Sequence, residues 1–200
     1  KLADLGWLRP LNNPAYKAGE QQFQDSLPMF TDLFGHLVAP GTLDVAERVG
    51  RQLARSYDWI VDNRPLTLAH VDFRLANFFF DRPGVPVPVI DWQLSVQSIG
   101  VGDISYFIVQ SMTAEMRHEH GEALLRRWYD AIVERGVSEY SYDDAWSDFR
   151  RSVLFQLAIP VVGASNLDPA NERGRQLLEC LLQRAFQAVA DYDCAEMLLP

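Results

Sequence analysis

Apolar residues recur at helical spacing along most of this 200-residue chain, and the pattern is interrupted once, between residues 66 and 92. Helices are predicted over residues 15–27, 29–37, 42–63, 122–135, 141–157 and 174–192, and a further buried helix is predicted to begin at Asp103. Because β-type sequence is confined to the interruption, we predict a mainly α fold (α+β) with one small β-hairpin.

The interruption itself has the composition of a β-hairpin. Residues 78–80 are aromatic and residues 85–90 are rich in valine, with an Arg-Pro-Gly turn sequence between them. Pro86 and Pro88 fit a strand only where their missing N–H groups face away from the ladder. We therefore predict one hairpin over Phe78–Ile90.

Composition and charge narrow the classes of function. A 48% hydrophobic content suits one compact domain or one large lobe. The net charge of −9 and the lack of a basic face argue against nucleic-acid binding; the acidic balance indicates either solubility or steering of a cationic substrate. No apolar run reaches the ~20 residues of a membrane span. The chain begins at Lys1 without the features of a signal peptide, and it has two cysteines, so a cytoplasmic location is expected.

Polar residues of a particular kind surround the predicted hairpin. Asp72 and Asn77 lie five residues apart on the loop that precedes it, and Asp91 follows its second strand. Since a hairpin brings its two ends together, Asn77 and Asp91 can face one point. Phosphoryl transfer needs a carboxylate that orients the attacking hydroxyl, a role that Asp72 fits. It also needs hard oxygen ligands for Mg²⁺, a role that Asn77 and Asp91 fit.

The order of these residues resembles that of a known superfamily. The strings HVDFRLAN at residues 70–77 and IDW at 90–92 resemble the catalytic loop and metal-binding Asp of the aminoglycoside phosphotransferase and choline kinase-like superfamily. The sequences of these motifs are most similar to those of bacterial phosphotransferases of the ecdysteroid kinase-like type. Gly100 and Asp103 resemble the family's Gly-x-x-Asp segment.

The resemblance implies both a fold and an activity. It implies the C-terminal lobe of a protein-kinase-like fold, and transfer of a phosphoryl group from ATP or GTP, with Mg²⁺, to a hydroxyl of a small molecule. Asp72 would act as base, and Asn77 and Asp91 would hold the metal and nucleotide. His70 and Asp103 would brace the loop. Arg74 would contact substrate or phosphate, or form a salt bridge.

Two departures from the family pattern affect this interpretation. Val71 stands where the family usually has Gly, which tolerates backbone angles that Val does not. No Gly-rich loop is present, and the only lysines are Lys1 and Lys17. We therefore expect residues 1–200 to be the C-terminal catalytic and substrate lobe, whose partner is an ATP-clamping N-terminal lobe of the same parent protein. This piece alone is expected to be inactive.

Alternatives remain open at this point. A catalytically weak pseudokinase or a small-molecule binding module would keep the same fold, whereas a metal-dependent hydrolase built on His70 and Asp72 would need further ligands. Asp103 could ligate metal or cap a helix. Three other segments have both a site interpretation and a simpler one. Residues 118–120 could bind metal or belong to a surface helix, and Trp128, Trp146 and Phe149 could line a pocket or pack in the core. Asp143, Asp144 and Asp148 could bind a cation or form a solvated helix start.

Overall fold

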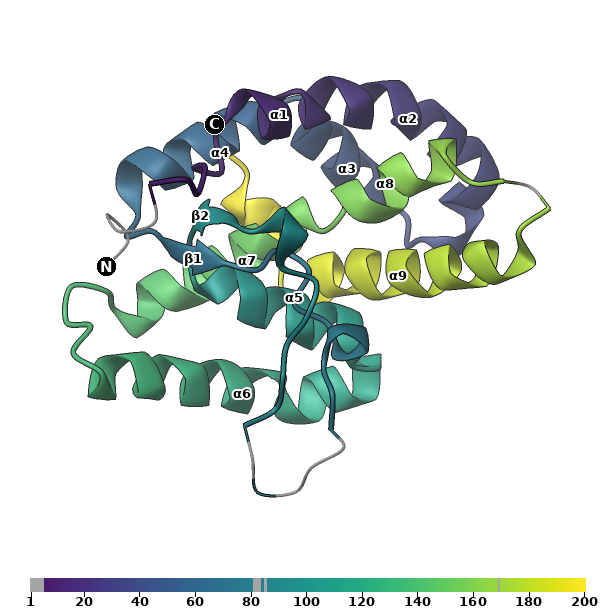
Figure 1. The fold of residues 1–200 in the computed structure, drawn as a ribbon. Helices are drawn as coiled ribbons and strands as arrows, with labels where there is room; N and C mark the ends of the chain where they lie inside the picture. Colours follow the sequence, from purple (N-terminus) through teal and green to yellow (C-terminus); the bar gives the residue numbers. More distant parts are fainter. Residues whose placement is uncertain (1–5, 81–83, 85, 169) are drawn as a thin grey trace.

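The structure is a computed structural model that describes residues 6–80, 84, 86–168 and 170–200 (Figure 1). Most of these residues are helical, which confirms the predicted fold class. The α-helices are α1 (Pro14–Lys17), α2 (Gly19–Phe34), α3 (Thr42–Gly50), α4 (Leu53–Asn63), α5 (Val101–Ser111), α6 (Ala114–Glu134), α7 (Tyr142–Phe155), α8 (Ala158–Ser165) and α9 (Glu172–Asp191). Short 3-10 turns cover Gly35–Leu37, Leu75–Asn77, Trp92–Leu94 and Cys194–Met197. None of the helices in these ranges is long and apolar enough to cross a membrane.

A small antiparallel sheet lies among the helices. Strand β1 (Thr67–Ala69) pairs with β2 (Val96–Ser98), with Leu68 opposite Gln97. Residues 8–11 extend this sheet on the far side of β2, because Gln97 N–H donates to Arg9 O at 2.8 Å and Leu11 N–H donates to Gln97 O at 2.9 Å. The sheet therefore fixes the residues before the Asp72 segment against those after Asp91.

The hairpin predicted over Phe78–Ile90 differs in detail from the sheet that is found. Its described residues form one isolated bridge between Phe78 and Val89, supported by a hydrogen bond from Phe79 N–H to Pro88 O at 3.1 Å. The regular strands lie outside it, in β1 and β2, because the prolines of this segment remove ladder donors. Of the turn predicted at residues 82–84, residues 82 and 83 lie outside the described residues.

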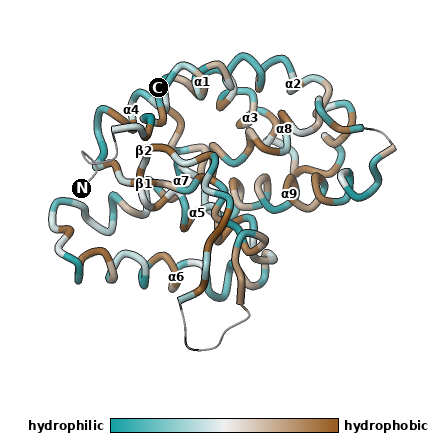
Figure 2. The backbone as a smooth tube through the Cα atoms, in the orientation of Figure 1, coloured by the Kyte–Doolittle hydropathy of each residue, from teal (hydrophilic) through white to brown (hydrophobic). Residues whose placement is uncertain are grey.

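The helices pack around one apolar core. Helix α2 lies against α8, α5 lies against α7, and α9 contacts both α5 and α8. Phe30 of α2 stacks on Phe186 of α9, with ring centroids 5.2 Å apart. Figure 2 shows hydrophobic and hydrophilic residues alternating along these helices, as expected for helices that bury one face.

Two helix boundaries differ from the predicted ones. The helix predicted over 42–63 is broken into α3 and α4, since the chain turns at residues 51–52 directly after Gly50. Gly50 lies so close to Phe23 that an added Cβ would stand 2.7 Å from the ring. Close helix packing thus explains the Gly, and periodicity alone did not reveal the break. Conversely, α2 continues through Pro28, where two helices were predicted.

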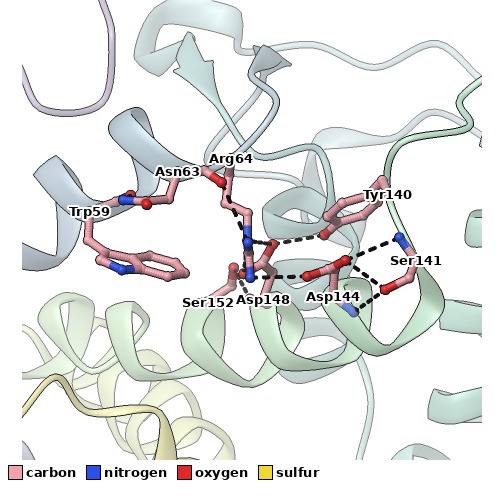
Figure 3. Close-up of polar contacts among 8 residues, drawn as sticks. All are labelled: Trp59, Asn63, Arg64, Tyr140, Ser141, Asp144, Asp148 and Ser152. Atoms are coloured by element: carbon pink, nitrogen blue, oxygen red, sulfur yellow. Dashed lines mark hydrogen bonds and ion pairs between the residues drawn. The ribbon is translucent and has the colours of Figure 1, made fainter.

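A group of polar side chains connects the end of α4 to α7 just before β1 (Figure 3). We call it the Arg64–Asp148 cluster (Trp59, Arg64, Tyr140, Asp144 and Asp148). Arg64 Nε donates to both carboxylate oxygens of Asp148, at 2.8 and 3.0 Å, and the Tyr140 hydroxyl donates to Asp148 at 3.0 Å. Arg64 also lies 3.3 Å from Asp144 and over the Trp59 ring. The interpretation of Asp148 as part of a solvated helix start is wrong, since this residue is fully buried.

Candidate active site

The segment of residues 70–77, here called the Asp72 loop, follows directly from β1. Its N-terminal half is held by Asp103, the third residue of α5. Asp103 Oδ2 accepts the His70 N–H at 2.8 Å, and Asp103 Oδ1 accepts the Val71 N–H at 2.9 Å. The predicted contact between Asp103 and the loop backbone is thus confirmed. Burial raises the pKa of Asp103, and the two backbone hydrogen bonds oppose that rise.

Val71 adopts the backbone geometry that the family pattern would assign to Gly. Its φ is 72°, in the left-handed region. The chain therefore takes a glycine-like conformation here without a Gly. Asp91 is also left-handed, with φ of 68°, a conformation that Asp tolerates better than a β-branched residue.

The Asp72 carboxylate is fixed by two side chains of its own loop. Asn77 Nδ2 donates to Asp72 Oδ2 at 2.9 Å and to the Asp72 carbonyl at 2.8 Å. Since both acceptors are oxygens, the amide orientation is defined and Asn77 Oδ1 is turned away from Asp72. Arg74 Nε lies 3.0 Å from Asp72 Oδ1, but the contact lacks hydrogen-bond geometry. Of the two roles predicted for Arg74, the structure contains the salt bridge.

His70 links the Asp72 loop to the segment that carries Asp91. Its Nε2 lies 2.8 Å from Ile90 O, and its Nδ1 accepts the Asp72 N–H at 3.2 Å. A carbonyl can only accept and an amide N–H can only donate, so these partners define the neutral imidazole with its proton on Nε2. Ile90 N–H also donates to Asn77 O at 3.0 Å. This hydrogen bond pairs the backbone at Asn77 with the backbone next to Asp91, so the two residues lie near each other in space. His70 itself is wholly buried.

One face of α5 lies along the whole Asp72 loop, and the sequence analysis missed most of it. Ser111 Oγ accepts the Leu75 N–H at 3.0 Å, and the Phe107 ring lies 5.7 Å from that of Phe78. Burial, followed by the nearby charge of Asp72, raises the pKa of Tyr106, so this residue of α5 lies close to the candidate base. The signal was present, because positions 103, 107 and 111 are four residues apart on one helix face.

The other candidate segments do not join this site. His118 Nε2 lies 3.3 Å from Asp191, and His120 Nε2 lies 3.7 Å from its neighbour Glu119. Among the described residues there is no group of three or more His, Cys, Asp or Glu side chains suited to a metal ion. The aromatic residues predicted to pack in the core do so: Trp146 stacks on the buried Phe149, and Trp128 packs against the same core.

Comparison with known proteins agrees with this geometry. The profile of the ecdysteroid kinase-like family matches residues 10–137, which include the Asp72 loop, Asp91 and Asp103. The match spans more than half of the chain. Comparisons with curated proteins and with solved structures give no match. The family has a kinase-like phosphotransferase fold, as the motifs predicted. The chain therefore belongs to the ecdysteroid kinase-like family.

Proposed function

We propose that this chain carries the catalytic loop of a phosphotransferase that transfers the γ-phosphoryl group of ATP or GTP to an alcohol of a small molecule. The observation that carries the proposal is the fixed Asp72 carboxylate, which Asn77 holds at 2.9 Å in a loop braced from α5. Such positioning is the main contribution that a protein makes to phosphoryl transfer.

Asp72 would act on the acceptor hydroxyl. Its carboxylate would accept the hydroxyl proton as the oxygen attacks the γ-phosphorus and the bond to the β-phosphate breaks, leaving ADP or GDP. Arg74 and Asn77 hold the two carboxylate oxygens from within the loop, so the direction of the carboxylate is set before substrate arrives. Tyr106, whose pKa is raised by burial and by the charge of Asp72, lies on α5 near the same carboxylate.

Asn77 and Asp91 would hold Mg²⁺. The donor set fits this ion, because an amide oxygen and a carboxylate are both hard ligands and Mg²⁺ usually keeps several waters beside one or two protein oxygens. The hydrogen bonds of the Asn77 amide nitrogen to Asp72 leave its oxygen directed elsewhere. When bound, the metal would neutralise charge on the transferred phosphate. His70 and Asp103 would act on neither metal nor substrate and would hold the backbone.

We further propose that residues 1–200 are the C-terminal lobe of a two-lobed cytoplasmic enzyme. The described residues contain one lysine, Lys17, and its Nζ is paired with Asp58 at 2.7 Å in the region of α1 and α4. A phosphate-gripping lysine and a Gly-rich loop would therefore come from an N-terminal lobe of the same parent protein.

A binding module or pseudokinase is the second candidate. One observation favours it: both oxygens of the Asp72 carboxylate have partners within the loop, Arg74 at Oδ1 and Asn77 at Oδ2. An acceptor hydroxyl would have to displace or share one of them. A protein in which these contacts persist with substrate bound would hold the small molecule without transferring phosphate.

The two candidates differ in the effect of Asp72→Asn on the full-length parent protein. We expect single-turnover transfer to a panel of small-molecule alcohols to slow by about 10²–10⁴, the usual contribution of a general base, with nucleotide affinity nearly unchanged. Asp143→Asn, at an exposed position of α7, is the control and should leave both unchanged. Unchanged transfer by the Asp72 variant would remove this residue from the mechanism. Nucleotide binding by the wild type without transfer to any alcohol would favour the binding module.

A further inference from the structure

Val71 has the least favourable backbone conformation for its residue type among the described residues. Three non-glycine residues there have positive φ, namely Val71, Asp91 and Asp193. Aspartate visits the left-handed region fairly readily, whereas a β-branched side chain clashes with its own backbone there. A strained residue of this kind persists only when its surroundings impose the conformation.

The surroundings of Val71 impose it through three consecutive amides. The N–H of His70 and that of Val71 donate to the two oxygens of Asp103, and the N–H of Asp72 donates to the His70 ring. Every one of these acceptors is a side chain. The loop therefore receives its shape here from Asp103 and His70, and its own backbone preference opposes that shape.

We propose that Val71 is a positioning residue whose strained backbone makes the direction of Asp72 depend on the Asp103 carboxylate. With Gly at this position the loop would hold its left-handed turn unaided. With Val, the turn relaxes when its hydrogen bonds to Asp103 are lost, and the Asp72 carboxylate then moves away from Asn77. The proposal concerns the conformation of this chain and does not rest on the reaction that Asp72 performs.

Amide hydrogen exchange, measured residue by residue by NMR on the 200-residue chain, tests the dependence. Asp103→Asn keeps one acceptor oxygen and replaces the other by a donor, so it breaks one of the two backbone hydrogen bonds. We expect exchange at His70 and Val71 to accelerate about 100-fold or more. When Val71→Gly is added, the acceleration should shrink by roughly tenfold, the fold-change that corresponds to the usual strain of such a residue. Exchange at Leu182, buried in α9, corrects for any change in global stability.

Val71→Ala separates backbone strain from side-chain packing. The Val71 side chain packs against the core, and both Val71→Gly and Val71→Ala remove that packing, but only Gly removes the penalty for positive φ. Val71→Ala should therefore fail to reduce the effect of Asp103→Asn. If Asp103→Asn acts equally in all three backgrounds, or if Ala rescues as well as Gly, the proposal is wrong.

A comparison that retains Asp103 covers the case in which Asp103→Asn does not fold. With the carboxylate intact, the Val71→Gly variant should show slower exchange at residue 71 than the Val71→Ala variant, by about tenfold after correction for intrinsic rates. Equal exchange in the two variants would overturn the proposal without any use of the Asp103 substitution.

Discussion

Two polar groups lie at opposite ends of the three-residue strand β1, and they are built differently. Before the strand, the Arg64–Asp148 cluster is closed: Asp148 is fully buried, and Arg64 and Tyr140 occupy its oxygens. After the strand, the Asp72 loop is partly open: Asp91 is exposed, and the Asn77 amide oxygen is turned away from Asp72. A carboxylate enclosed by its own chain is available only to that chain, whereas an exposed one such as Asp91 can bind something else. The two ends of one short strand thus carry an enclosed polar group and a partly exposed one.

The largest effect that tests this comparison is the loss of Asp148. Asp148→Ala removes one partner of a buried ion pair and leaves Arg64 without its main acceptor, which typically costs about 3–5 kcal/mol. Urea unfolding of the 200-residue chain measures it. Asp143→Ala, on the same helix but exposed, should change the free energy of unfolding by less than about 0.5 kcal/mol. A cost for Asp148→Ala below about 1 kcal/mol would mean that the cluster is not a structural anchor.

A smaller effect is expected at the other end of β1. In Asp72→Ala, Asn77 keeps its hydrogen bond to the backbone carbonyl of residue 72, and Arg74 is free to turn toward solvent. The free energy of unfolding should therefore fall by about 1 kcal/mol or less. The same urea titration gives the value. A cost as large as that of Asp148→Ala would show that the Asp72 loop is also a structural anchor, and the distinction would fail.

The smallest effect concerns the pH dependence of the two carboxylates that face Arg64. The hydrogen bond from Ser141 holds the pKa of Asp144 below its usual 3.8, so the stability that it contributes is present above that pH and is lost as pH falls through the folded value. Burial raises the pKa of Asp148, although Arg64 opposes the rise; the folded state then binds a proton first, and stability rises as pH falls through that value.

Unfolding curves between about pH 3 and pH 7 check this difference. Relative to wild type, Asp144→Asn should cost a few tenths of a kcal/mol at neutral pH, because the Asp144 side chain is 40% exposed, and the cost should vanish in acid. For Asp148→Asn, the difference in free energy of unfolding from wild type should change with pH in the opposite direction. If the difference in free energy of unfolding from wild type changed with pH in the same direction for both variants, Asp148 would not be enclosed as described.

The sequence predicted the fold class and the residues of the Asp72 loop, because both depend on local patterns. Helical stripes require only neighbouring residues, and Asp72, Asn77 and Asp91 lie within one short segment. The Arg64–Asp148 pair spans 84 residues, so no local pattern could indicate it. For Val71, only the resemblance, which places Gly at this position, pointed to a left-handed backbone, since a Val by itself predicts extended backbone. The two hydrogen bonds that Asp103 accepts explain why Val71 departs from that preference.

The isolated bridge that residues 8–11 form beside Gln97 also has a consequence for folding kinetics. The contact between Gln97 and Leu8 closes a loop across 89 residues, and that between Asp103 and His70 closes one across 33. Closing long loops costs chain entropy before any contact offsets it, so such contacts form late. Pulsed hydrogen exchange during refolding should therefore show protection in α9 before it appears at His70 and Val71; the reverse order would contradict this. A chain caught midway through folding would have its helices but no assembled site.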